Sequence, residues 1–154
     1  MLRRLPFALL CALLVASTLP AAEAPLDRYQ TVTVEPTKPS IYVGTVSLTM
    51  PVLVREGATY ATTYAARVFP YFFSSEQGRL WIDFPVGDLR RLERGETINF
   101  TGRARNDDGE ERRVEGRVVP ADAFTGKIKV RVFVSKRIEL IFNTTYRFGE
   151  NTVP

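Results

Sequence analysis

The stretch ETINFTGRARNDDGEERRVEGRVV, residues 96–119, decides the fold. From Ile98 to Ala104 every second residue is apolar or small, and the residues between them are polar or charged. This period of two is typical of a β-strand with a buried face, because successive side chains point to opposite sides of a sheet. Residues 107–109 read Asp-Asp-Gly, which suits a tight turn, and residues 112–119 return along the first strand. The stretch therefore predicts an antiparallel hairpin.

The same alternation recurs on both sides of this hairpin, and short polar turns separate most of the alternating segments. Seven or eight strands joined in this way predict an all-β protein, built as an antiparallel meander. The further strands are expected at residues 45–54, 59–69, 79–84, 128–134 and 138–148.

Residues 59–69 are the ambiguous segment. Tyr60, Tyr64 and Val68 stand at helical spacing, so a helix is the alternative. The segment is rich in β-branched threonine and has no charged face, and strands are expected on both sides of it. We therefore predict a strand here.

The meander must bury one face of every strand, either by closing into a barrel or by stacking two sheets. The run of successive hairpins favours a small barrel. The alternative is a two-sheet, immunoglobulin-like sandwich, because the connections at residues 85–95 and 120–126 are long enough to cross between sheets. In the first connection Asp88 is expected to cap one helical turn that Gly95 closes.

The N-terminus has the composition of a secretory signal. Arg3 and Arg4 precede an apolar run from Leu5 to Leu19, and small residues follow it. We expect the protein to be exported to the periplasm or the extracellular space. The apolar run is shorter than the roughly 20 residues that a membrane-spanning helix needs, so no transmembrane segment is expected in the mature chain.

The rest of the chain predicts one domain between two short extensions. Prolines in the segment before Ile41 predict an extended leader containing one edge strand, at Tyr29 to Val34. The expected division is a signal peptide at residues 1–24, the leader at 25–40, a single all-β domain at 41–148 and a tail at 149–154.

The residue inventory argues against most catalysis. The chain has no histidine, and Cys11, its single cysteine, lies in the expected signal. The commonest general base, metal ligand and thiolate nucleophile are therefore missing. The acidic turn at residues 106–111 does not match the ligand spacing of a calcium loop. We expect no enzyme activity, no metal site and no cofactor.

Arginines supply a candidate anion site. Three of them share the loop before residue 95, and others decorate the hairpin at positions expected to point outward. Guanidinium groups suit bidentate capture of anions. Acidic residues are interleaved with them, so cross-strand ion pairs are the alternative. The net charge of +4 and the mixed signs argue against a nucleic-acid partner. The candidate residues are Arg90, Arg91, Arg94, Arg103, Arg105, Arg112 and Arg113.

Small residues at inward positions supply a candidate ligand site. On the apolar side of the hairpin, three positions carry glycine or alanine, which leave room for a guest unless large neighbours fill it. The stretch RVFPYFFSSEQGRLW, residues 67–81, carries more aromatic residues than one core can absorb, and it is expected to form the mouth of the cavity. The candidate residues are Tyr64, Phe69, Tyr71, Phe72, Phe73, Trp81, Phe100, Gly102, Ala104 and Gly116.

These patterns predict a non-catalytic exported β-domain that binds an apolar or amphipathic, lipid-like small molecule. An acidic head group of such a ligand is expected near the arginines. The alternative is a structural or protein-interaction sandwich, which would use the aromatic residues around Phe72 and Trp81 as an exposed contact patch.

Overall fold

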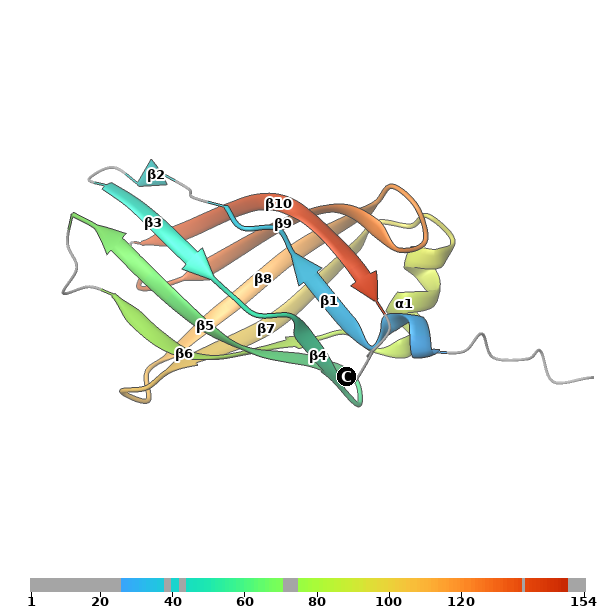
Figure 1. Ribbon diagram of the computed structural model, residues 1–154, viewed down its shortest axis with the longest axis horizontal. Coiled ribbons are helices and arrows are strands. Elements are labelled where there is room, and N and C mark those ends of the chain that lie inside the picture. Colours follow the sequence, from blue (N-terminus) through green and yellow to red (C-terminus); the bar gives the residue numbers. More distant parts are fainter. Residues whose placement is uncertain (1–25, 38–39, 42–43, 71–74, 137, 150–154) are drawn as a thin grey trace, which may run out of the picture.

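The computed structural model describes residues 26–37, 40–41, 44–70, 75–136 and 138–149. The fold is an antiparallel β-barrel with one short α-helix (Figure 1). The predicted meander and the barrel are therefore confirmed. In the described part of the chain, no helix is long and apolar enough to cross a membrane.

The elements follow one another with short connections. The 3-10 helix η1 (Leu26–Tyr29) leads into β1 (Thr31–Val34), β2 (Ser40–Ile41), β3 (Gly44–Thr49), β4 (Leu53–Glu56) and β5 (Thr59–Phe69). Then come β6 (Glu76–Asp83), α1 (Val86–Glu93), β7 (Ile98–Asn106), β8 (Glu111–Pro120), β9 (Thr125–Phe133) and β10 (Glu139–Gly149).

The barrel closes because β5 is paired along both of its edges. One edge pairs with β6, and the other pairs with β4 near Thr59 and with β3 near Phe69. Strands β3 and β4 thus occupy one strand position in succession. The ladder continues from β6 through β7, β8, β9 and β10 to β1, which reaches β4. The result is a closed barrel of eight strand positions, with β2 as an extra strand along β3.

Strand β1 lies in the segment expected to form a leader. Its register pairs Val32 with Phe148 of β10 on one side and with Leu53 of β4 on the other. The strand expected at a sheet edge is therefore paired on both sides, and without it the barrel would stay open between β4 and β10.

Two further details differ from the sequence expectations. The alternation of buried and exposed residues was expected to run unbroken from Val46 to Val54, but it shifts by one residue at Pro51. Val46 and Leu53 are therefore buried, while Val54 is 39% exposed.

The helix begins at Val86, after Pro85, and Asp88 lies inside its first turn, where it forms an ion pair with Arg91. Proline suits the start of a helix because its missing N–H would be unpaired there.

Aromatic rings fill one end of the barrel. The ring centroids of Tyr29 and Tyr146 lie 5.0 and 5.3 Å from that of Phe148, and Tyr60 and Phe84 pack in the same cluster. Helix α1 packs against β7 and β8 at this end and buries Leu89 and Leu92, each 1% exposed. Rings thus fill most of this half of the interior and leave a small cavity of about 40 Å³ among them.

The ring of Phe100 occupies the space beside Gly116. A Cβ atom built on Gly116 would lie 2.0 Å from Cζ of Phe100, and the two residues face each other across the β7–β8 ladder. Glycine at this position is therefore explained by a ring of the protein's own core, and a side chain here would collide with it.

We expect Gly116→Ala to lower the free energy of unfolding by about 1–3 kcal/mol, because the added methyl group overpacks the core. The matched control is Gly87→Ala in α1, where no atom lies within 4 Å of the added Cβ. That change should raise the free energy of unfolding by about 0.5–1 kcal/mol through helix propensity. Urea denaturation measures both, and equal effects of the two substitutions would contradict this account of Gly116.

Candidate functional site

The other half of the barrel holds an apolar cavity of about 140 Å³. It lies toward the end that carries the β5–β6, β7–β8 and β9–β10 turns. Aliphatic side chains from β3, β6, β8, β9 and β10 form most of its wall. The main lining residues are Val46, Leu48, Met50, Leu80, Ala104, Val114, Val130, Val132, Leu140 and Phe142.

The cavity exists because the large side chains are unevenly distributed along the barrel. An eight-stranded barrel is just wide enough for side chains to fill its interior. Aromatic rings fill the interior in the layer of Phe84, Phe100 and Phe148. The next layers along β7 and β9 carry the smaller side chains of Ala104, Val130 and Val132. A layer of small and β-branched side chains cannot reach the barrel axis, so volume remains there.

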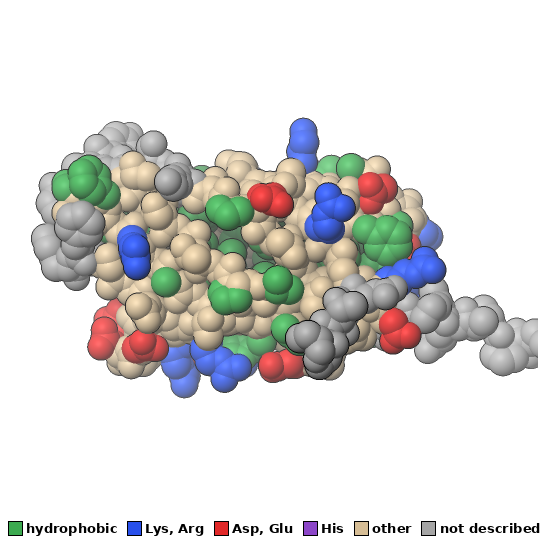
Figure 2. All heavy atoms as spheres, viewed as in Figure 1, with side chains coloured by type: hydrophobic (Ala, Val, Ile, Leu, Met, Phe, Trp, Pro, Cys, Tyr) green, Lys and Arg blue, Asp and Glu red, His purple; other side chains and the backbone are tan. Residues whose placement is uncertain are grey.

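A break in one strand position opens the cavity sideways. Strand β1 ends at Val34, the N–H of Glu35 still donates to the carbonyl oxygen of Thr145 in β10, and β2 begins at Ser40. Pro36 lies in the described part of this connection, and a proline has no N–H to donate to a ladder. Residues 34–37 line the cavity on one side, and Leu48 and Met50 line it on the other. Figure 2 shows a hollow in this face, with hydrophobic side chains inside it.

A polar cluster lies in the wall of this apolar space. The Tyr64 hydroxyl donates a hydrogen bond of 2.9 Å to Oε1 of Glu76. Nη2 of Arg112 forms ion pairs with Oε2 of Glu76 at 3.5 Å and with Oε2 of Glu110. Asn106 is buried and donates to the same two carboxylates. Tyr64, Glu76 and Arg112 also line the cavity, so it has an apolar wall with one polar corner.

The hydroxyl of Tyr64 stays protonated in this position. Burial raises the pKa of Tyr64 well above its ordinary value of 10.0, and the nearby Glu76 carboxylate raises the pKa further. A carboxylate that accepts from this hydroxyl would be repelled by a tyrosinate. The cluster is therefore a stable arrangement of donors and acceptors over the physiological pH range.

The structure brings together only some of the residues expected at a ligand site. Tyr64 and Ala104 line the cavity, whereas Phe100 lies in the aromatic core and covers Gly116. A Cβ on Gly102 would lie 2.4 Å from the carbonyl oxygen of Trp81, so this glycine allows a close backbone approach and leaves no open space.

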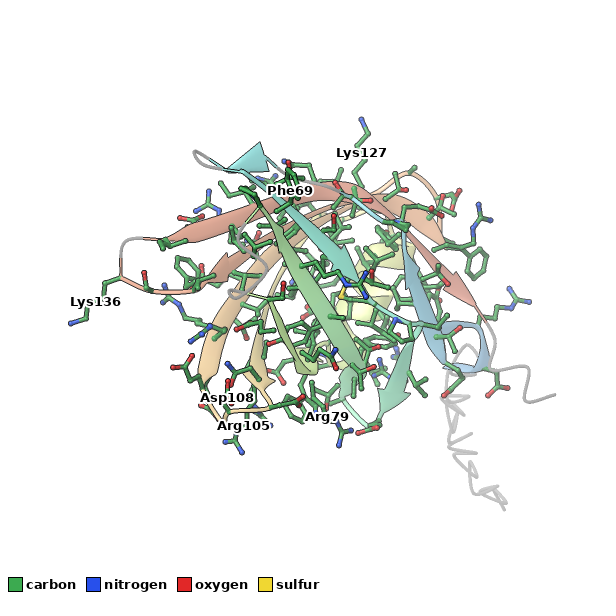
Figure 3. All side chains as sticks on the ribbon, turned by 60° about the vertical axis from the view of Figure 1, so that its left-hand side comes forward. Phe69, Arg79, Arg105, Asp108, Lys127 and Lys136 are labelled. Atoms are coloured by element: carbon green, nitrogen blue, oxygen red, sulfur yellow. The ribbon has the colours of Figure 1, made fainter. Side chains whose placement is uncertain are left out.

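The aromatic segment expected at the mouth is described only in part. Phe69 is 61% exposed at the end of β5, and Figure 3 shows it beside β3. Trp81 faces outward, and the guanidinium carbons of Arg79 and Arg103 each lie 5.3 Å from its ring centroid. The expected contacts Tyr71, Phe72 and Phe73 lie outside the described residues.

Most of the candidate anion-binding arginines already face carboxylates or rings. Arg91 and Arg94 pair with Glu96, and Arg105, which points away from the barrel in Figure 3, pairs with Glu111. Arg113 pairs with Glu115 and stacks on Phe133. Arg103 stacks on Trp81, and Arg90 is exposed on α1. The interleaved acids thus account for most of these arginines by ion pairing.

Arg112 differs from the outward position expected for it. It pairs with Ala104 in the β7–β8 ladder and therefore points inward, and its side chain is only 14% exposed. Adjacent residues in a strand point to opposite sides, so Arg112 and Arg113 could not both face solvent. Counting back along the strand from the buried Val118 would have placed Arg112 inside.

Two other hollows lie on the outer surface. One, of about 340 Å³, is lined by charged and polar residues around Gln77 and Asp107. The other, of about 380 Å³, is lined by residues of β7, β8 and β9 around Arg117 and Lys129. Both are bordered by exposed charges that water solvates, so the internal cavity is the stronger candidate for a specific small-molecule site.

Comparisons of the chain with protein-family models, with curated proteins and with solved structures found no match in any of the three.

We expect Tyr64→Phe to lower the free energy of unfolding near neutral pH by about 1 kcal/mol, because Glu76 loses a donor. The raised pKa of Tyr64 means that the unfolded chain releases this proton first, so stability falls as the pH rises above about 10. The Tyr64→Phe variant lacks this titrating group. Above pH 10 its free energy of unfolding should therefore fall by about 1.4 kcal/mol less per pH unit than that of the wild type.

Chemical denaturation at neutral pH and above pH 10 measures both effects. Thr63→Ala is the control, because Thr63 is exposed on the same strand and points away from the cavity. A Tyr64→Phe variant with the same dependence on pH as the wild type would show that this hydroxyl titrates equally in both states.

Proposed function

We propose that this protein binds a small apolar or amphipathic, lipid-like molecule, with the apolar part of the molecule inside the barrel. The observation that carries the proposal is the apolar cavity of about 140 Å³, which is larger than the space of about 40 Å³ left among the rings of the aromatic core. A chain that fills one half of a barrel with rings could have filled the other half in the same way. Val130, Val132 and Ala104 instead leave space there.

The size and lining of the cavity restrict its contents. A cavity of about 150 Å³ lined by aliphatic and aromatic side chains stays dry and accepts a molecule of the size of benzene. The enclosed part of the guest is therefore a ring of that size or a chain of about six carbon atoms. A longer molecule would extend through the lateral opening between residues 34–37 and β3.

We also propose that the protein acts outside the cytoplasm as a binding protein without catalytic activity. The signal-like composition of residues 1–24 supports export, and the lack of histidine throughout the chain supports a role in binding. Tyr64, Glu76 and Arg112 hold one another through hydrogen bonds and ion pairs, which suits a static recognition site.

The direct test is the content of the protein purified from its own host. Native mass spectrometry and organic-solvent extraction should find a bound apolar molecule in stoichiometric amount. Protein stripped of this guest should bind added hexane or 2-hexanone, and calorimetric titration measures that binding. A clean apo mass together with no binding of either probe would contradict the proposal.

We expect Ala104→Leu to weaken binding of hexane by about tenfold or more, because three added carbon atoms enter the cavity wall. The matched control is Ala121→Leu, the same substitution at an exposed turn. Circular dichroism should show both variants folded. If Ala104→Leu binds hexane as well as the control does, the guest lies elsewhere.

A further inference from the structure

We infer that the outer face of β8 and β9 binds a phosphate or sulfate dianion between Arg117 and Lys129. These two residues border the surface hollow of about 380 Å³ on the outside of the barrel. The inference is independent of the guest in the internal cavity. It depends on one row of side chains across neighbouring strands, on the charge balance of the hollow and on the donors that surround it.

Four exposed polar side chains form one row across the outer face. Arg117 of β8 lies opposite Lys129 of β9. Asn99 of β7 is the neighbour of Arg117 on the other side, and Asn143 of β10 is the neighbour of Lys129. All four side chains are exposed. Side chains directly opposite each other have Cβ atoms only about 4.5–5.5 Å apart, so donors on adjacent strands can reach one common anion.

The facing pair of Arg117 and Lys129 is unfavourable in the protein alone, because like charges directly opposite each other destabilise a sheet. Two other cation pairs face each other in these ladders, Arg79 with Arg105 and Arg103 with Arg113. In each of them one member forms an ion pair with a glutamate, and the other stacks on the Trp81 ring.

The pair of Arg117 and Lys129 differs from both of these pairs. In the described part of the chain neither residue has a carboxylate or a ring as a partner. An anion bound between their side chains would remove the repulsion, as glutamate side chains do for the other pairs.

The hollow has a positive charge balance. Its charged lining residues give a net charge of +2, and they are Arg117, Lys129, Arg131 and Glu115. Glu115 and Arg131 each have a further ion-pair partner, one arginine and one glutamate, and these two charges cancel. Lys127, the next outward residue of β9, adds positive charge beside Lys129 and points away from the barrel in Figure 3. The carboxylate of Asp122 accepts hydrogen bonds from N–H groups of its own turn. A dianion matches this balance better than a monoanion does.

The donors at the hollow also suit a tetrahedral anion better than a carboxylate. The guanidinium of Arg117 can donate two parallel hydrogen bonds, and the ammonium of Lys129 donates from the adjacent strand. The Asn99 amide and the Thr101 hydroxyl line the same hollow. A phosphate or sulfate group offers at least three acceptor oxygens in different directions, whereas a carboxylate has two in one plane.

The test titrates the wild-type protein with sulfate, inorganic phosphate and acetate in separate calorimetric experiments at neutral pH and low ionic strength. We expect sulfate and phosphate to bind at least about tenfold more tightly than acetate, and added sodium chloride to weaken the binding. Absence of binding of both dianions at about 10 mM would overturn the inference. Acetate binding as tight as that of sulfate would also overturn it.

Two matched variants test the position of the site. Lys129→Gln and Lys136→Gln remove the same charge, and Lys136 lies at the β9–β10 turn, where it points away from the barrel in Figure 3. We expect Lys129→Gln to weaken sulfate binding by about tenfold and Lys136→Gln by less than about twofold. Lys129→Gln also removes the repulsion with Arg117, so its melting temperature should be equal to or higher than that of the wild type. Equal losses of affinity in the two variants would show that sulfate responds only to net charge, and the inference would be wrong.

Two further probes distinguish the sources of such a group. Glycerol 3-phosphate carries it on a soluble molecule, and phosphatidylcholine vesicles that contain phosphatidic acid present it on a membrane surface. Binding of either probe that Lys129→Gln weakens supports the site and identifies its source. Hexane should bind equally to the wild type and to Lys129→Gln, because the hollow and the cavity lie on opposite faces of the sheet. The binding of hexane therefore tests the proposed function separately from the dianion site.

Discussion

The interior of a closed eight-stranded barrel has a fixed width, and the rest of this structure depends on how the chain fills it. Every inward position either reaches the axis or leaves volume there. Rings from Tyr29, Tyr60, Phe84, Phe100 and Phe148 meet at one end, and α1 closes that end with Leu89 and Leu92. The valines of β9 and the alanine of β7 do not reach the axis at the other end, and the cavity lies there.

The same closure depends on a strand position that the chain builds in separate pieces. Strand β1 joins β10 to β4, and β2 then pairs with β3 alone. Between them Pro36 cannot continue the ladder, because it has no N–H to donate. The barrel is thus sealed where the rings pack and laterally open where the cavity lies. The aromatic core stabilises one half of the barrel, and the apolar cavity occupies the other half.

Polar groups within the barrel are placed at the edge of this apolar space. Tyr64, Glu76, Asn106 and Arg112 are joined by hydrogen bonds and an ion pair, which reduces the cost of removing them from water. Most of the remaining charge lies outside, where arginines and carboxylates alternate along the strands and solvate the surface. The inward turn of Arg112 is what gives the cavity a polar corner.

The sequence by itself determined the all-β class and most of the strands, and it favoured a barrel over a sandwich, because alternation with a period of two is a local property of each strand. It also singled out Tyr64 and Ala104, which both line the cavity. Only the tertiary structure decided that Phe100 fills the space beside Gly116, that Pro51 changes the phase between Val46 and Leu53, and that Arg112 faces inward. These features depend on register and on contacts between strands, and a periodicity within one strand carries no information about which residues of another strand lie opposite.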